Sequence, residues 1–275
     1  MRLGVSTTGH SLKILRKLRQ WRIPDFFELG ICSSDMAERI IAELRGEIAT
    51  IHGLPFLGRG EEDFMFNPCA DPASAAEVTK QMAEGAVKRG LNYEVYGVHA
   101  GLLGDLLTPG VFKVSNRISF EEGLKNVNTF KRFLEGDRII LENIYGWDED
   151  SPAMGMTPTE LADMSSVMPL LLDLGHAAVN MEHYRRLSLD ELNPENLDIK
   201  EVHISFVKFD GPPPWDHLEY VRTPVNDRIL SKLAELAASK PDLPVVMEIK
   251  GGLETIRRNL ELIRNRIERP QTPLS

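Results

Sequence analysis

Several strongly apolar stretches of this sequence end in ionisable side chains. The stretch LLLDLGH (170–176) runs from three leucines into Asp173 and His176. A buried strand has no use for either residue, because an unpaired charge in an apolar interior costs several kcal/mol. We therefore expect a strand to end here, with its tip facing a polar cavity.

The same pattern recurs along the whole chain. The polar residues at the ends of apolar runs are Glu28, His52, His99, Glu142, Asp173 with His176, His203 and Glu248. His10 follows the first run, and Asp216 and His217 follow the seventh. Imidazoles mixed with carboxylates, without thiolates, suit Zn, Mn, Fe or Co better than Ca or Mg. A divalent cation would also offset several carboxylates in one pocket, so the pattern predicts a metal site.

These residues need elements that bring them together. The apolar runs lie at 2–7, 25–31, 47–53, 93–101, 138–144, 168–176, 199–206 and 244–251. Stretches with helical periodicity or caps lie between them, at 11–21, 71–90, 119–134, 157–166, 226–239 and 252–267. Apolar strands joined by helical crossovers predict a parallel sheet covered on both faces. Eight such units fit an α/β protein with a single closed (β/α)8 barrel, whose strands present their carboxyl ends on one face.

An open doubly wound sheet is the alternative architecture, but it usually carries a Gly-rich phosphate loop after its first strand. The segment STTGHS (6–11) is not such a loop. With no linker-like shift in composition, we expect one domain over 1–275, with a frayed tail from about 268.

Composition narrows the class of protein. The formal net charge of -9 disfavours broad binding to nucleic acid. The two cysteines, Cys32 and Cys69, stand in no paired motif, which favours a reducing cytoplasm over a disulfide framework. We expect neither a signal peptide nor a membrane span, since no window approaches about 18 apolar residues.

Six short motifs resemble the xylose-isomerase-like barrel superfamily. They are IHG (51–53), VHAG (98–101), LENI (141–144), LDLGHA (172–177), VHIS (202–205) and MEI (247–249). That group holds sugar isomerases and epimerases, AP-endonuclease type 2 repair enzymes and multinuclear-iron oxygenases. The resemblance runs from about residue 2 to 267 and implies a TIM barrel.

The resemblance also implies a ligand set. In the isomerase and epimerase branch one divalent ion is held by residues that match Glu142, Asp173, His203 and Glu248. The two glutamates there also act as acid and base, and His176, His52 and His99 would bind substrate oxygens. In the endonuclease branch these positions hold three zinc ions together with an Asp-x-His pair. Asp216 and His217 are adjacent in this chain, which departs from that pair and puts a third ion in doubt.

The first hypothesis is therefore a metal-dependent isomerase or epimerase of a sugar, sugar phosphate or related polyol, with Mn, Zn, Mg, Co or Fe as cofactor. His10, Trp215 and Lys208 are candidate substrate contacts, and Lys250 is a further candidate for a phosphate. A multinuclear phosphodiesterase or iron oxygenase is the second hypothesis, and a non-catalytic barrel that binds a sugar-like ligand is the third. We expect a small-molecule substrate, no membrane or nucleic-acid partner, and leave a homo-oligomer open.

Overall fold

The computed structural model describes residues 1–56, 66–108, 111–134, 138–146, 151–210 and 216–269. Its centre is a closed barrel of eight parallel strands, in the order β1-β10-β9-β8-β7-β4-β3-β2. The strands are β1 (Arg2–Ser6), β2 (Phe26–Leu29), β3 (Ile48–His52), β4 (Val95–His99), β7 (Ile139–Glu142), β8 (Leu170–Asp173), β9 (Ile199–Ile204) and β10 (Pro244–Met247). The predicted (β/α)8 TIM barrel is confirmed, and each predicted strand contributes to it.

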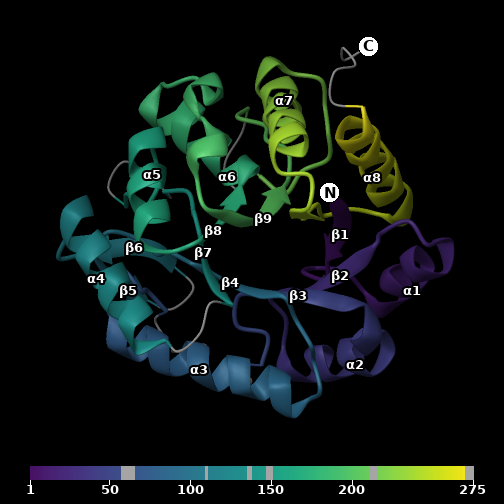
Figure 1. The fold of residues 1–275 in the computed structure, drawn as a ribbon, viewed down its shortest axis with the longest axis horizontal. Coiled ribbons are helices and arrows are strands. Elements are labelled where there is room, and N and C mark those ends of the chain that lie inside the picture. The colour runs from purple at the N-terminus through teal and green to yellow at the C-terminus, as the bar shows by residue number, and fades with distance from the viewer. Residues whose placement is uncertain (57–65, 109–110, 135–137, 147–150, 211–215, 270–275) are drawn as a thin grey trace.

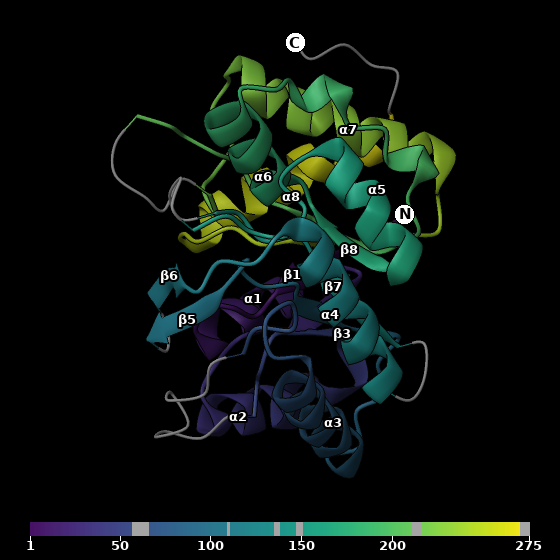
Figure 2. The same cartoon turned by 90° about the vertical axis from the view of Figure 1, so that its left-hand side faces the viewer.

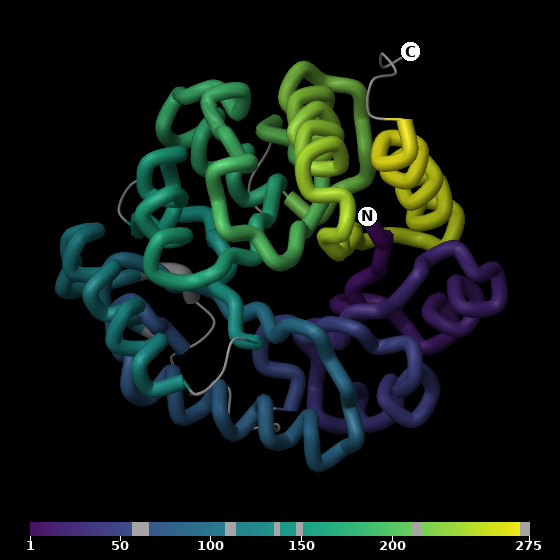
Figure 3. Tube along the Cα trace, in the orientation of Figure 1, coloured from purple at the N-terminus to yellow at the C-terminus, as the bar shows by residue number. Residues whose placement is uncertain are grey.

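Helices surround this barrel on the outside (Figure 1). They are α1 (Leu12–Trp21), α2 (Ser34–Leu44), α3 (Pro72–Lys88), α4 (Phe120–Phe133), α5 (Pro158–Val167), α6 (Leu174–Ala178), α7 (Pro224–Ser239) and α8 (Leu253–Glu268). The chain goes once around the barrel, so that α8 returns beside α1 and β10 pairs with β1 (Figure 3). Among these helices, none is long and apolar enough to cross a membrane.

Two of these helices were not predicted. Ser33 caps α2 by accepting a hydrogen bond from the backbone N–H of Met36. Helix α6 begins directly after Asp173, inside the apolar run read as a strand, and continues into a π-helix at Val179–Arg185. Short 3-10 helices lie at Arg45–Glu47, Leu189–Glu191 and Pro194–Asn196.

A hairpin of two antiparallel strands, β5 (Asp105–Thr108) and β6 (Val111–Ser115), follows β4. The hairpin stands at one end of the barrel (Figure 2). Because it follows the last residue of β4, this is the end at which the strands finish.

Strand register decides which side chains face the barrel axis. His99 on β4 pairs with Glu142 on β7, and Asp173 on β8 pairs with His203 on β9. Side chains two residues apart on a strand point to the same face. One layer below this polar ring, the interior contains Gly97 and Leu171, and a Cβ on Gly97 would lie 2.5 Å from Leu171 Cδ1. The polar ring therefore sits on a close-packed interior.

Candidate metal centre

The ionisable residues converge at the carboxyl end of the barrel, around a cavity of about 310 Å³. Of the residues expected there, those lining it are His52, His99, His176, Asp216, His217 and Glu248. Glu142, Asp173 and His203 lie outside this lining and expose none of their surface. The rest of the lining is Thr8, Ile31, Ile144, Tyr145 and Lys250.

The first group of ligand-type side chains is the set Glu142, Asp173, His203 and Glu248. Three of its buried atoms lack a hydrogen-bond partner among the described residues: Glu142 Oε1, Asp173 Oδ2 and His203 Nδ1. His203 Nδ1 lies 3.3 Å from Glu248 Oε2 and 3.8 Å from Glu142 Oε1. Buried polar atoms without partners cost roughly 1–3 kcal/mol each, so such a cluster requires an explanation. A divalent cation would satisfy all three atoms, and the donor set fits one.

The second group shares Glu142. The Oε2 atom of Glu142 lies 2.5 Å from His52 Nε2 and 3.0 Å from His99 Nε2. The two imidazole rings meet edge to face, with centroids 5.0 Å apart. Because Glu142 Oε1 belongs to the first group and Oε2 to the second, this carboxylate is placed to bridge them.

The third group consists of His176, Asp216 and His217. Asp216 Oδ2 lies 3.1 Å from His176 Nε2 and 3.1 Å from His217 Nε2. His217 adopts a left-handed backbone conformation, with φ of 55°. That turn allows two adjacent residues to aim at one point, so the departure from an Asp-x-His pair does not prevent convergence.

Both histidines of the third group are held by backbone carbonyl groups. His176 Nδ1 lies 2.8 Å from the carbonyl oxygen of Asn143, and His217 Nδ1 lies 3.1 Å from that of Glu248. A carbonyl only accepts, so each Nδ1 carries the proton. The lone pair of each neutral ring is then on Nε2, the atom that faces Asp216, as in metal-binding histidines whose other nitrogen is tied down.

The LLLDLGH stretch has a local explanation. Asp173 Oδ1 accepts from the backbone N–H of His176 at 2.7 Å and so caps α6, which leaves Oδ2 free for the first group. Asn143 exchanges two hydrogen bonds with the backbone of Asp173, at 3.0 and 2.8 Å, and fixes the tip of β8 against that of β7. A side chain at Gly175 would place its Cβ 2.2 Å from Ser205 Oγ. The Asp-Leu-Gly-His spacing thus starts a helix and presents two ligands at once.

Neighbouring imidazoles and carboxylates at this site shift one another's pKa values. Burial alone would lower the pKa of His52, but the adjacent Glu142 raises it to about 9. Burial opposes ionisation of Glu142, yet His52 and His99 hold its pKa well below the usual value. His203 is also buried, and Glu28 raises its pKa well above the usual value. Metal ligands must be deprotonated, so a divalent ion would take the place of these protons.

Two of the three predicted substrate contacts do not line the cavity, and the third cannot be placed from the described residues. His10 is buried outside the cavity lining, where burial lowers its pKa. Lys208 is exposed and forms an ion pair with Asp210, 3.1 Å apart. Trp215 lies outside the described residues.

Two residues at the site were missed by the sequence reasoning. Tyr145 lines the cavity, with its hydroxyl 3.4 Å from Asp216 Oδ1 and its ring edge-on to His176. Glu201 is fully buried on β9, and neither of its carboxyl oxygens has a hydrogen-bond partner among the described residues. Its position two residues before His203 was the available signal, because it places Glu201 on the same inward face.

Comparisons with known proteins identify the fold. No family model and no curated protein matches this chain. Among solved structures, a D-tagatose 3-epimerase-like protein shares 22% identity over 98% of this chain and 97% of its own, with a TM-score of 0.59. A D-psicose 3-epimerase studied with D-fructose shares 12% identity over 97% and 98%, with a TM-score of 0.54.

A xylose isomerase domain protein from Planctomyces limnophilus is similar as well. It shares 12% identity over 97% of this chain and 96% of its own, with a TM-score of 0.52. Identities this low establish the fold rather than an activity. The superfamily resemblance of the motifs is therefore confirmed at the level of the fold: this chain has the architecture of the xylose-isomerase-like TIM barrels.

Proposed function

We propose that this protein is an enzyme with a multinuclear divalent-metal centre that acts on a small substrate. The observation that carries the proposal is the position of Glu142, which is fully buried and faces imidazoles with both carboxyl oxygens. A carboxylate used as the base of a one-metal enzyme should face the substrate. Glu142 does not line the cavity, so its geometry suits a bridging ligand better.

The chemistry depends on which metal the centre holds. Zinc or manganese would lower the pKa of a bound water and polarise a phosphoester, whereas iron would support oxidation or oxygenation. The protein itself would supply imidazoles, neutral when a metal is bound, and carboxylates in fixed orientations. The two imidazoles of the third group, His176 and His217, are held by the backbone carbonyls of Asn143 and Glu248.

The cavity sets the size of the substrate. About 310 Å³ is at the lower end of the volumes seen for small-molecule sites. Lys250 lies on its rim, and no described carboxylate lies within ion-pair distance of its ammonium group. Tyr145 adds a hydroxyl whose proton is directed at Asp216 Oδ1 and whose oxygen can accept a hydrogen bond from a substrate hydroxyl. We infer a substrate with oxygen-rich and anionic groups, such as a phosphate ester or a carboxylate.

An isomerase or epimerase of a sugar, sugar phosphate or related polyol is the second candidate. Two observations favour it: the likeness to the D-tagatose 3-epimerase-like and D-psicose 3-epimerase structures, and Glu248, which lines the cavity and could move a proton. In that case only the first group would hold a metal, and His52, His99 and His176 would bind substrate hydroxyls.

The number of bound metal ions separates the two candidates. We would measure metal content by mass spectrometry on protein purified without an affinity metal, after reconstitution with Zn²⁺, Mn²⁺ or anaerobic Fe²⁺. The variants His99→Ala, Asp173→Asn and His217→Ala each alter one of the three groups. Glu182→Gln is the control: it loses the ion pair with Arg228, keeps an oxygen that can accept from the backbone N–H of Leu189, and does not line the cavity.

Two or three ions per chain, with one lost in His99→Ala or His217→Ala, would support the multinuclear enzyme. A single ion, lost in Asp173→Asn and kept in the two histidine variants, would favour the isomerase or epimerase. The loaded protein would then be assayed with bis(p-nitrophenyl) phosphate, with D-fructose and D-tagatose, and for oxygen uptake. No ion under any condition would refute both candidates and favour a non-catalytic binding barrel.

A further inference from the structure

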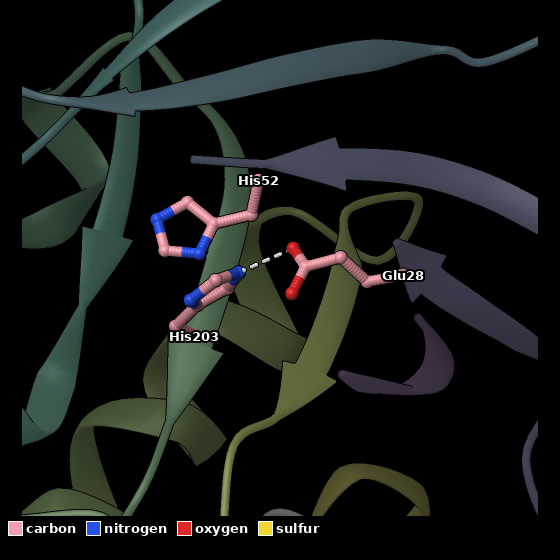
Figure 4. A group of neighbouring side chains, drawn as sticks. All are labelled: Glu28, His52 and His203. Atoms are coloured by element: carbon pink, nitrogen blue, oxygen red, sulfur yellow. Dashed lines mark hydrogen bonds and ion pairs between the residues drawn. The ribbon is translucent and has the colours of Figure 1, made fainter. Parts of the chain in front are cut away.

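Among the strand-end carboxylates named in the sequence analysis and described by the structure, Glu28 belongs to none of the three groups above. Glu28 is fully buried on β2 and does not line the cavity. Figure 4 shows its side chain crossing the barrel interior towards His203 on β9. Its Oε2 atom lies 2.8 Å from His203 Nε2, and both side chains have no exposed surface.

This hydrogen bond fixes the direction of His203. An ionised carboxylate only accepts, so the proton of the pair lies on Nε2. A neutral ring protonated at Nε2 carries its lone pair on Nδ1. Nδ1 is the atom that faces Glu248 at 3.3 Å and lacks a hydrogen-bond partner. The nitrogen turned away from Glu28 is thus the one needed as a metal ligand.

The same carboxyl group also faces His52. In Figure 4 the His52 ring lies beside the pair, with one nitrogen turned towards Glu28 and His203. The three residues offer ligand-type atoms within 4.8 Å of one another. His52 Nε2 bonds to Glu142, while His52 Nδ1 and Glu28 Oε1 both lack a hydrogen-bond partner among the described residues. These are the free atoms through which Glu28 could hold a second imidazole.

The cluster could be taken for a further metal site, but its geometry argues otherwise. His203 would have to bind one ion through Nδ1 and another through Nε2, although Nε2 already donates to Glu28. A carboxylate that accepts from the outer nitrogen of a metal-binding histidine is, by contrast, a recurrent arrangement, and its removal typically costs about 10- to 100-fold in metal affinity.

We propose that Glu28 is a positioning residue, which holds His203 in the ring orientation and tautomer that the metal centre requires. The inference rests on the proposed metal centre and deepens it. Glu28 does not line the substrate cavity, so its effect reaches the centre through the imidazole of His203.

Zn²⁺ is the probe for the test, because it is diamagnetic and has no redox chemistry. Its affinity would be measured by competition with a chelating dye for the wild type, Glu28→Gln, Glu28→Leu and the control Glu182→Gln. The tautomer of His203 would be read from long-range ¹H–¹⁵N spectra of the protein in EDTA at alkaline pH, where no ion sets it, with its signals assigned by their loss in His203→Gln. A purely structural role for Glu28 would not move the tautomer.

We expect Glu28→Leu to weaken Zn²⁺ binding about 10- to 100-fold and to lose the Nε2–H tautomer. Glu28→Gln keeps an acceptor oxygen, so it should keep the tautomer, but it should lose about three- to tenfold in affinity because a neutral amide accepts a weaker hydrogen bond than a carboxylate. If Glu28→Leu does not fold, Glu28→Gln decides, since affinity within twofold of the wild type would overturn the proposal. Wild-type affinity and tautomer in Glu28→Leu would overturn it as well. A wild type that binds no Zn²⁺ refutes the metal centre itself, which is a different outcome.

Discussion

Replacing Glu142 with Gln should destabilise the metal-free protein in a way that depends on pH. Glu142 is fully buried and its Oε2 atom lies 2.5 Å from His52 Nε2. That proximity raises the pKa of His52 from 6.5 to about 9, against the effect of burial. A histidine whose pKa rises on folding stabilises the fold fully below its unfolded value. It loses that contribution as the pH rises through the folded value.

The magnitude follows from the two pKa values. At roughly 1.4 kcal/mol per pKa unit, the step from 6.5 to about 9 is worth about 3.5 kcal/mol, of which about 3 kcal/mol is present at pH 6. Glu142→Gln should therefore cost about 3 kcal/mol at pH 6 and very little at pH 9.5. For a barrel of this size, that corresponds to a fall of roughly 6–12 °C in melting temperature at pH 6.

The assay is thermal unfolding in EDTA at both pH values, for the wild type and Glu142→Gln. The control Glu182→Gln loses an ion pair in which Arg228 donates two hydrogen bonds to Glu182. No histidine takes part in this pair, so the loss of stability in the control should be the same at pH 6 and pH 9.5. An equal loss of stability for Glu142→Gln at pH 6 and pH 9.5 would refute the reasoning, because cavity or packing effects do not titrate.

Three further predictions follow from particular contacts. Burial and the nearby Glu28 raise the pKa of Glu201 to about 8, so the wild type loses stability as the pH rises from about 4.5 to 8. In urea unfolding, Glu201→Gln should therefore be about 3 kcal/mol more stable than the wild type at pH 7 and little different at pH 4.5. Lys250→Met should raise KM for an anionic substrate about tenfold or more, as loss of a hydrogen bond to a charged group implies, while exposed Lys208→Met should leave KM unchanged. Gly97→Ala should lower the free energy of unfolding by roughly 1–3 kcal/mol in the same urea experiment, because its Cβ would meet Leu171 Cδ1 at 2.5 Å. The control Gly46→Ala, whose Cβ would meet open space, should not lower it.

The barrel could be predicted from the sequence because its signals are local. Each strand is a short apolar run between amphipathic stretches, and eight such units close only in a few ways. The same argument placed the ligands: parallel strands finish at one end, so residues such as His99 and Glu142 had to meet there. In the structure they pair directly in the register between β4 and β7.

Local signals failed where one run of apolar residues served two elements. The run over 168–176 reads as a strand, yet β8 ends at Asp173 and α6 begins at once. Apolar periodicity cannot separate a buried strand from a buried helix over so few residues. The turn there depends on Asp173 capping the helix and on Ser205, which leaves no room for a side chain at Gly175.

The sequence by itself determined the inventory of this protein: an eight-stranded parallel barrel with histidines and carboxylates at its strand ends. Only the tertiary structure decided how they divide into groups. It placed Glu142 between two groups, brought the adjacent Asp216 and His217 onto one point through a left-handed turn, and turned Glu28 towards His203 on a strand that is not its neighbour. The physical reason is that strand spacing fixes which end of the barrel a side chain reaches, whereas its partner depends on register, rotamer and the backbone of distant segments.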